Sequence, residues 1–161
     1  MRSELDPSNL TSFILAGKSL LTIENSIRGT HKTLSFMRDK HREDLWYVYI
    51  RGDKDKAVRL PGFETKKNWL YCGIVVWESP IKNQPKELAF KLTKGSKILR
   101  GSEGWKAIDW FIRNINVMPD YCRNKGVKIY HEGVCGRCGR TLTDPVSIQA
   151  GFGPECIKRV N

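Results

Sequence analysis

Three cysteines near the end of the chain have the spacing of metal ligands. Cys135 and Cys138 are separated by two residues, so both thiolates can reach one ion from a tight turn in which Gly136 and Gly139 relieve crowding. Cys156 follows Pro154, which suits the first turn of a helix, and a helix N-terminus favours a thiolate. The spacing therefore predicts a site for one Zn²⁺.

A structural zinc site takes four ligands, so a fourth side chain is needed. His131 lies four residues before Cys135 and would complete a Cys₃His set. Cys122 is the alternative and would give Cys₄, although the chain would have to double back to the turn that holds Cys135 and Cys138, which we call the knuckle. With protein ligands in all positions, the metal is expected to be structural. Cys72 lies in an apolar run and is predicted to be a buried thiol.

The cysteine segment resembles known zinc modules in two ways. A knuckle, an intervening hairpin and a ligand at a helix start resemble a short treble-clef zinc finger. The run from Cys135 to Ile148, followed by Gly-Phe-Gly-Pro-Glu-Cys156, also resembles a small C-terminal module of uncharacterised bacteriophage and bacterial proteins. In that family a histidine often precedes the knuckle, which matches His131, and a glutamate is common where this chain has Val146. The resemblance implies zinc binding and a phage or bacterial origin.

Basic residues outnumber acidic residues by 28 to 17, which gives a net charge of +11. Such a balance is typical of a protein that meets a polyanion, most often nucleic acid. Arg137 and Arg140 are the sharper candidates for phosphate contacts, because the knuckle fixes their backbone. The full set expected to neutralise phosphates is Lys91, Lys94, Lys97, Arg100, Arg123, Lys125, Lys128, Arg137 and Arg140.

The sequence carries none of the common enzyme motifs that we sought. It contains no glycine-rich dinucleotide or phosphate loop, no His-Glu-x-x-His motif and no nucleophile elbow. No catalytic residue and no small-molecule substrate are therefore assigned. No apolar run is long enough to cross a membrane, and no secretory segment is recognisable. We expect a cytoplasmic protein without a membrane partner.

Hydrophobic patterning predicts an antiparallel sheet with one packed helix. Strands are expected at 12–16, 19–23, 33–37, 45–50, 70–77 and 88–92, with the first two forming a hairpin. Polar turns are expected at 53–56 and 61–62. The helix follows an N-cap at Ser102, where Trp105, Ile108, Ile112 and Ile115 recur at helical spacing.

Aromatic side chains alternate along the predicted strand at 45–50. Trp46 points opposite to Tyr47 and Tyr49, so one face of this strand could form a platform that stacks bases. Burial in the core is the more common role of such aromatic residues, and we expect it here.

These features predict an α+β chain with a flexible tail at 1–10, a β-rich domain at 11–118 and a zinc-binding module at 119–161. The function expected is that of a basic phage or bacterial accessory protein. It would bind nucleic acid, RNA or DNA, with little sequence specificity and hold one structural Zn²⁺. Two alternatives stay open: an interaction module that inhibits or redirects a host enzyme, and a metal-dependent nuclease.

Overall fold

An antiparallel sheet runs through the centre of the molecule. The computed structural model describes residues 2–51 and 69–160. Within these residues the strands are β1 (Ser3–Glu4), β2 (Lys18–Asn25), β3 (Thr30–Arg38), β4 (Leu45–Arg51), β5 (Trp69–Glu78), β6 (Glu87–Lys91) and β7 (Val127–His131). Their order across the seven-stranded sheet is β1-β7-β2-β3-β4-β5-β6, and every neighbouring pair is antiparallel. The predicted α+β class is confirmed.

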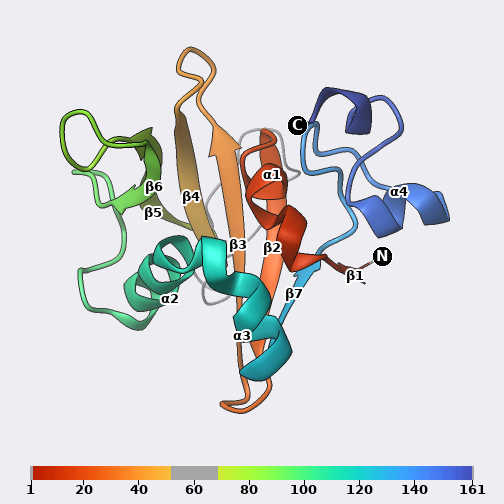
Figure 1. Ribbon diagram of the computed structural model, residues 1–161, viewed down its shortest axis with the longest axis horizontal. Helices are drawn as coiled ribbons and strands as arrows, with labels where there is room; N and C mark the ends of the chain where they lie inside the picture. Colours follow the sequence, from red (N-terminus) through yellow and green to blue (C-terminus); the bar gives the residue numbers. More distant parts are fainter. Residues whose placement is uncertain (1, 52–68, 161) are drawn as a thin grey trace.

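Short helices cover one face of this sheet. They are α1 (Leu10–Ile14), α2 (Glu103–Arg113) and α3 (Met118–Asn124), and α4 (Pro145–Ala150) lies to the side with the C-terminal residues (Figure 1). Single 3-10 turns occur at Pro7–Asn9, Ile115–Val117 and Ile157–Arg159. The predicted cap of α2 is confirmed, because the Ser102 hydroxyl accepts the Trp105 N–H at 3.3 Å.

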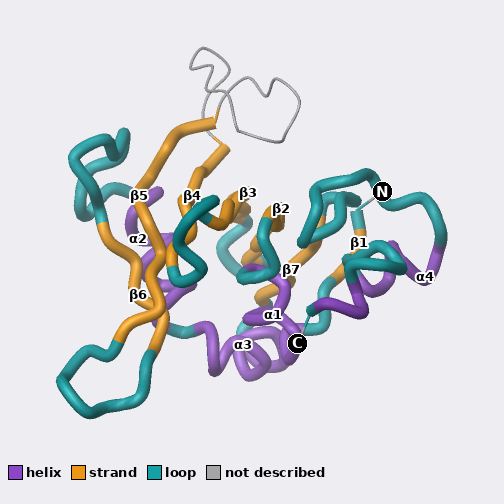
Figure 2. Tube along the Cα trace, turned by 90° about the horizontal axis from the view of Figure 1, so that it is seen from above, coloured by secondary structure: helices purple, strands orange, loops and turns teal. Residues whose placement is uncertain are grey.

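The hydrophobic core lies between this sheet face and the helices. Figure 2 shows α1 and α3 on one side of the curved sheet. Buried core residues of the strands include Leu21, Leu34, Phe36, Trp46 and Val48, and those of the helices include Phe13, Ile14, Ile108, Phe111 and Met118. Trp46 is only 3% exposed, so its expected burial is confirmed, whereas Tyr47 and Tyr49 are half-buried.

The segment 12–16, expected as the first strand of a hairpin, belongs to a helix. Asp6 caps the 3-10 turn that begins at Pro7, and the chain continues directly into α1. Leu10, Phe13 and Ile14 then recur at helical spacing and are all buried. A short apolar run fits a strand and a helix equally well, and the capped start decides for the helix. The strands expected at 19–23, 33–37, 45–50, 70–77 and 88–92 match β2 to β6, apart from small shifts at their ends.

Residues 3–5 of the expected flexible tail (1–10) lie beside β7. Ser3 and Glu4 pair with His131 and Tyr130 of β7, and Leu5 is only 5% exposed. The N–H of Leu5 donates to the carbonyl of Ile129 at 2.8 Å, which extends the pairing. These backbone bonds hold the N-terminal segment against the sheet.

The sheet crosses the expected boundary between residues 118 and 119. β7, which was assigned to the zinc-binding module, lies between β1 and β2, and α3 packs against it. The sheet thus contains residues from both sides of this boundary, and the division into a domain at 11–118 and a module at 119–161 stays a prediction. The turns expected at 53–56 and 61–62 lie outside the described residues.

Candidate functional site

The cysteine loop begins directly after β7. Val134 and Thr141 form an isolated antiparallel bridge, and the Leu142 N–H donates to the Gly133 carbonyl at 2.8 Å. Inside this narrow loop the Cys135 N–H donates to the Arg140 carbonyl at 2.7 Å. The Gly139 N–H donates back to the Cys135 carbonyl at 2.9 Å. These bonds form the tight turn that the spacing of Cys135 and Cys138 predicted.

Helix α4 brings the third cysteine back to this turn. Asp144 caps the helix by accepting the Ser147 N–H at 2.9 Å, and Gly151 ends it with a φ of +79°. The chain then passes Phe152, which is buried, and reaches Cys156 at the start of the 3-10 turn Ile157–Arg159. A helix therefore joins the turn at Cys135 and Cys138 to Cys156, where a hairpin was expected. Cys156 lies directly before a helical turn, as expected.

The three cysteines form a group that could hold a metal ion. Their sulfur atoms all lie within 4.8 Å of one another, and Cys135 and Cys156 are buried. The Gly153 N–H donates to the Cys135 sulfur at 3.4 Å, and the Arg137 guanidinium donates to the Cys156 sulfur at 3.8 Å. Such donors stabilise thiolates and orient them as ligands. A cavity of about 230 Å³ beside the sulfurs is also lined by Asp144 and Glu155.

The pKa values of two of these thiols shift in opposite directions. Burial acts to raise the pKa of Cys135, but hydrogen bonds from the backbone N–H groups of Cys138, Gly153 and Arg137 outweigh it, so the pKa falls below its usual range. Burial raises the pKa of Cys156, and the hydrogen bond from Arg137 offsets only part of this effect. Of these two thiols, Cys135 is therefore the one whose backbone hydrogen bonds favour the thiolate form that binds a metal.

His131, the preferred fourth ligand, lies outside this group. Its Nδ1 accepts the Gly133 N–H at 3.0 Å, and its Nε2 is hydrogen bonded to the carbonyl of Ile148. The side chain is fully buried. Both ring nitrogens are thus hydrogen bonded to backbone groups in this structure, and the expected role of His131 as the fourth ligand stays a prediction.

Cys122, the alternative, also lies outside the group of three. It belongs to α3 and is half-buried, and burial raises the pKa of its thiol. The predicted burial of Cys72 is confirmed, since its side chain is inaccessible and burial raises its pKa to about 12.

The comparisons with known proteins concern the same C-terminal segment. Residues 129–161 match the model of a family of unknown function (DUF6011). The match begins within β7 and includes His131 and the three cysteines, which are among the residues on which the module resemblance rests. It carries no statement about phages or zinc. No curated protein and no solved structure matches the chain.

The cations proposed for phosphate contacts are spread over the molecule. Lys91 lies on β6 at one edge of the sheet, whereas Lys128 lies on β7 near the other edge. Lys94, Lys97 and Arg100 follow β6 in the predicted basic loop, Arg123 and Lys125 lie at the end of α3, and Arg137 and Arg140 lie on the cysteine loop. Lys91 pairs with Glu78, and Arg123 pairs with Asp120. The nine residues therefore do not form one patch.

One of them, Arg137, lines a concave site that the sequence analysis missed. This cavity of about 430 Å³ lies between α1, the strands and the C-terminal residues. We call it the arginine groove, and it is lined by Thr11, Ser12, Leu15, Ala16, Arg38, Glu43, Trp46, Trp77, Arg137, Arg159 and Val160. Its lining contains three arginines and one acidic side chain. No sequence pattern links Arg38, Trp77 and Arg159, because they come from three distant segments of the chain.

Among the described residues, no helix has both the length and the apolar character needed to cross a membrane.

Proposed function

We propose that the protein binds nucleic acid with little sequence specificity and that its cysteine cluster holds one structural Zn²⁺. The observation that carries the first part is the arginine groove, where Arg38, Arg137 and Arg159 line one cavity together with two tryptophans. Arginine matches phosphate oxygens in geometry and keeps its charge at all physiological pH values. Because phosphate contacts carry no base information, binding through this groove would be nearly independent of sequence.

The donor set supports zinc as the metal. Three thiolates suit a borderline-soft divalent ion, and their backbone donors lower the negative charge on the sulfurs. The cysteine loop and the residues up to Cys156 form only one bridge and one short helix, so a metal would supply much of their stability. A compartment that keeps thiols reduced, such as the cytoplasm, suits this site.

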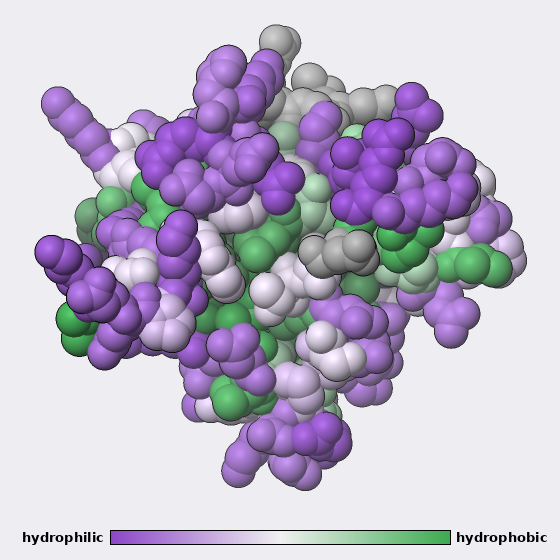
Figure 3. Space-filling model, turned by 45° about the horizontal axis from the view of Figure 1, so that its top comes forward, coloured by the Kyte–Doolittle hydropathy of each residue, from purple (hydrophilic) through white to green (hydrophobic). Residues whose placement is uncertain are grey.

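The face of the molecule shown in Figure 3 offers little continuous apolar surface to a protein partner. Hydrophilic side chains cover most of the face shown in Figure 3, and apolar residues form only a broken central strip between them. A protein-binding surface has a more continuous apolar centre. An acidic protein surface would still suit the arginines, so it is included below as a competitor.

The first prediction concerns the metal. We expect about one zinc per chain by elemental analysis, and a strong loss of zinc in Cys138→Ser, because this change removes one of three ligands. The controls are His131→Gln and Cys122→Ala, which should keep their zinc, since both residues lie outside the group. A zinc content that falls in His131→Gln but not in Cys138→Ser would contradict this assignment.

The second prediction concerns nucleic acid. Binding to oligonucleotides should weaken steeply between about 50 and 200 mM salt. Arg159→Gln should lower the slope of log K against log salt by about 1, because one phosphate contact is lost. Arg159 is preferred to Arg137 for this test, since Arg137 also donates to Cys156.

The matched control is Arg28→Gln, which removes the same charge from the exposed turn between β2 and β3. Its salt dependence should equal that of the unmodified protein. If no oligonucleotide binds at 50 mM salt, the proposed function is wrong.

A further inference from the structure

The two tryptophans of the arginine groove differ in how much of their surface is exposed. Trp46 is 3% exposed, and its Nε1 donates to the Leu15 carbonyl at 3.3 Å. Trp77, near the end of β5, is 37% exposed. One indole is therefore fixed in the wall of the groove, and the other presents free ring surface to a ligand.

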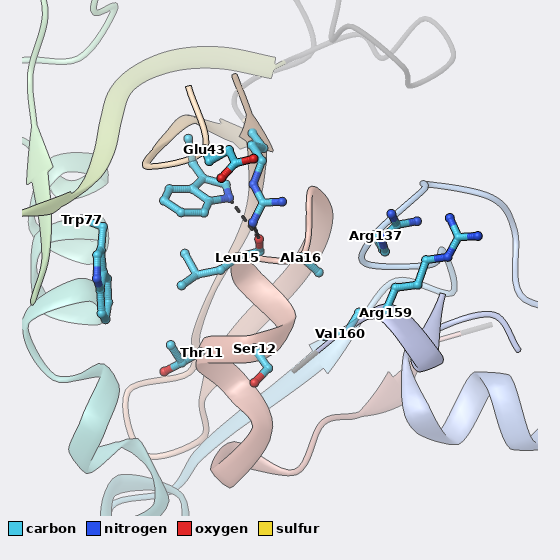
Figure 4. A pocket seen from close by; sticks show the side chains of 11 residues that line it. Thr11, Ser12, Leu15, Ala16, Glu43, Trp77, Arg137, Arg159 and Val160 are labelled. Atoms are coloured by element: carbon cyan, nitrogen blue, oxygen red, sulfur yellow. Dashed lines mark hydrogen bonds between the residues drawn. The ribbon is translucent and has the colours of Figure 1, made fainter. Parts of the chain in front are cut away.

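Two of the three arginines lie on the side of the groove opposite Trp77. Figure 4 shows Trp77 on one side of α1, and Arg137 and Arg159 on the other side. Arg38 is held nearer Trp46, because it donates to the Leu15 carbonyl at 2.7 Å and lies 5.3 Å from the centre of the Trp46 ring. A ligand that fills the groove would meet an aromatic face at one end and two guanidinium groups at the other.

Glu43 adds a carboxylate to this lining. It would repel a phosphate placed beside it, but it can accept a hydrogen bond from an N–H group of a base, such as the ring N–H of thymine. The three arginines outnumber it, so the groove as a whole still favours an anion. This mixture fits a ligand that has both a phosphate and a base.

We infer that the arginine groove binds a single-stranded segment of nucleic acid, with a base stacked on Trp77 and neighbouring phosphates on Arg137 and Arg159. The inference rests on the proposed function and names the ligand class of the same site. Bases in a duplex are stacked on one another, so their faces are closed to Trp77, whereas an unpaired base can stack on an aromatic side chain. A cavity of about 430 Å³ also suits a unit of nucleotide size better than the width of a duplex.

The test compares a labelled oligothymidylate with a duplex of the same length by fluorescence anisotropy at 50 mM salt. The single strand should bind about tenfold tighter than the duplex. Trp77→Ala should weaken binding of the single strand about tenfold or more, because base stacking is lost, and should leave duplex binding unchanged. Trp77→Phe, which keeps an aromatic face, should retain most of the affinity.

The matched control is Trp105→Ala. Trp105 is also half-buried beside an arginine, since the Arg100 guanidinium lies 5.5 Å from its ring centre, but it lies outside the groove. Its removal should not affect binding. Quenching of tryptophan fluorescence by the single strand, present in the unmodified protein and reduced in Trp77→Phe, gives a readout that does not depend on the folding of the alanine variant.

Three results would overturn the inference, and each has its own meaning. If the duplex binds as tightly as the single strand and Trp77→Ala has no effect, while Arg159→Gln still weakens binding, the ligand class is wrong and the proposed function stands. If neither nucleic acid binds, both are wrong. If polyglutamate displaces the oligothymidylate at equal charge concentration, the groove binds acidic polypeptides instead.

Discussion

The imidazole of His131 joins two backbone segments beside the cysteines. It accepts the N–H of Gly133 at the start of the cysteine loop and is hydrogen bonded to the carbonyl of Ile148 in α4. The ring is buried next to Phe13, with 6.3 Å between the ring centres. In this arrangement the neutral ring carries its proton on Nε2. At the scale of single residues, His131 thus positions the loop and α4 relative to each other.

A third prediction follows from the burial of this ring. Burial lowers the pKa of His131 below its ordinary value of 6.5, although the hydrogen bond to Ile148 and the charge of Glu132 act in the opposite direction. The unfolded chain therefore takes up the proton at a higher pH than the folded protein does. The contribution of His131 to stability is present above about pH 6.5 and is lost as the pH falls below it.

Urea unfolding at a series of pH values checks this expectation. The free energy of unfolding should fall more steeply below about pH 6.5 in the unmodified protein than in His131→Gln, which cannot titrate there. Loss of metal in acid affects both proteins, so the difference between the two curves isolates His131. Parallel curves would show that the ring does not titrate differently on folding.

The residues of the site differ in how far the sequence could predict them. Cys135, Cys138 and Cys156 were found because their spacing and the surrounding glycines and proline are local features. His131 has a suitable spacing too, but its pairing with Leu21 of β2 determines where the ring points. Strand register is set by distant segments, so the spacing alone could not reveal it.

At the scale of elements, the cysteine loop is fixed by close contact with α1 and the start of β2. The Lys18 N–H donates to the Gly136 carbonyl at 2.8 Å. A Cβ on Gly136 would lie 2.6 Å from the ring of Phe13, and a Cβ on Gly17 would lie 2.8 Å from the Arg137 carbonyl. Glycine is therefore needed at both positions for the cysteine loop to pack this closely against α1 and the start of β2.

A fourth prediction uses two glycines of the same segment. Gly136→Ala should lower the free energy of unfolding by about 1–3 kcal/mol, because the buried ring of Phe13 is enclosed by Phe152 and His131 and has little room to move. Gly153→Ala is the control, since a Cβ there meets nothing within 4 Å. Chemical denaturation of both variants measures the difference. Equal losses of unfolding free energy in the two variants would mean that the contact with Phe13 does not cause the destabilisation.

The elements differ in how clearly the sequence specified them. The strands at 45–50 and 70–77 were predicted from long runs of β-branched and aromatic residues, and they match β4 and β5. The run at 12–16 is too short for its period to decide between a helix and a strand. β7 was missed because a run of five residues that includes Lys128 and His131 gives little signal, and its partners lie far away in the chain.

At the scale of the whole molecule, the sheet and the cysteine segment are parts of one structure. β7 pairs with β1 on one side and β2 on the other, and the cysteine loop starts directly after it. The hydrophobic core contains Cys135 and Phe152 together with residues of the sheet and helices. Folding of the cysteine segment and folding of the sheet are therefore coupled.

The fifth prediction tests this coupling by truncation. A chain of residues 1–118 lacks α3 and β7, which leaves β2 without one of its two neighbours and β1 without its partner. We expect it to show no cooperative thermal unfolding by circular dichroism, because a large part of the core is removed. A sharp transition in this fragment would support the separate domain that the sequence analysis expected.

The place of β7 also bears on how the chain is made. Ser3 and Glu4 are synthesised long before their partners in the sheet, His131 and Tyr130. Until then the outer side of β2 has no neighbour, and the apolar side chains of β2 and α1 stay uncovered. Contacts between residues so far apart in sequence slow folding and prolong exposure to aggregation. The nascent protein is therefore most vulnerable just before its cysteines, and any metal they bind, become available.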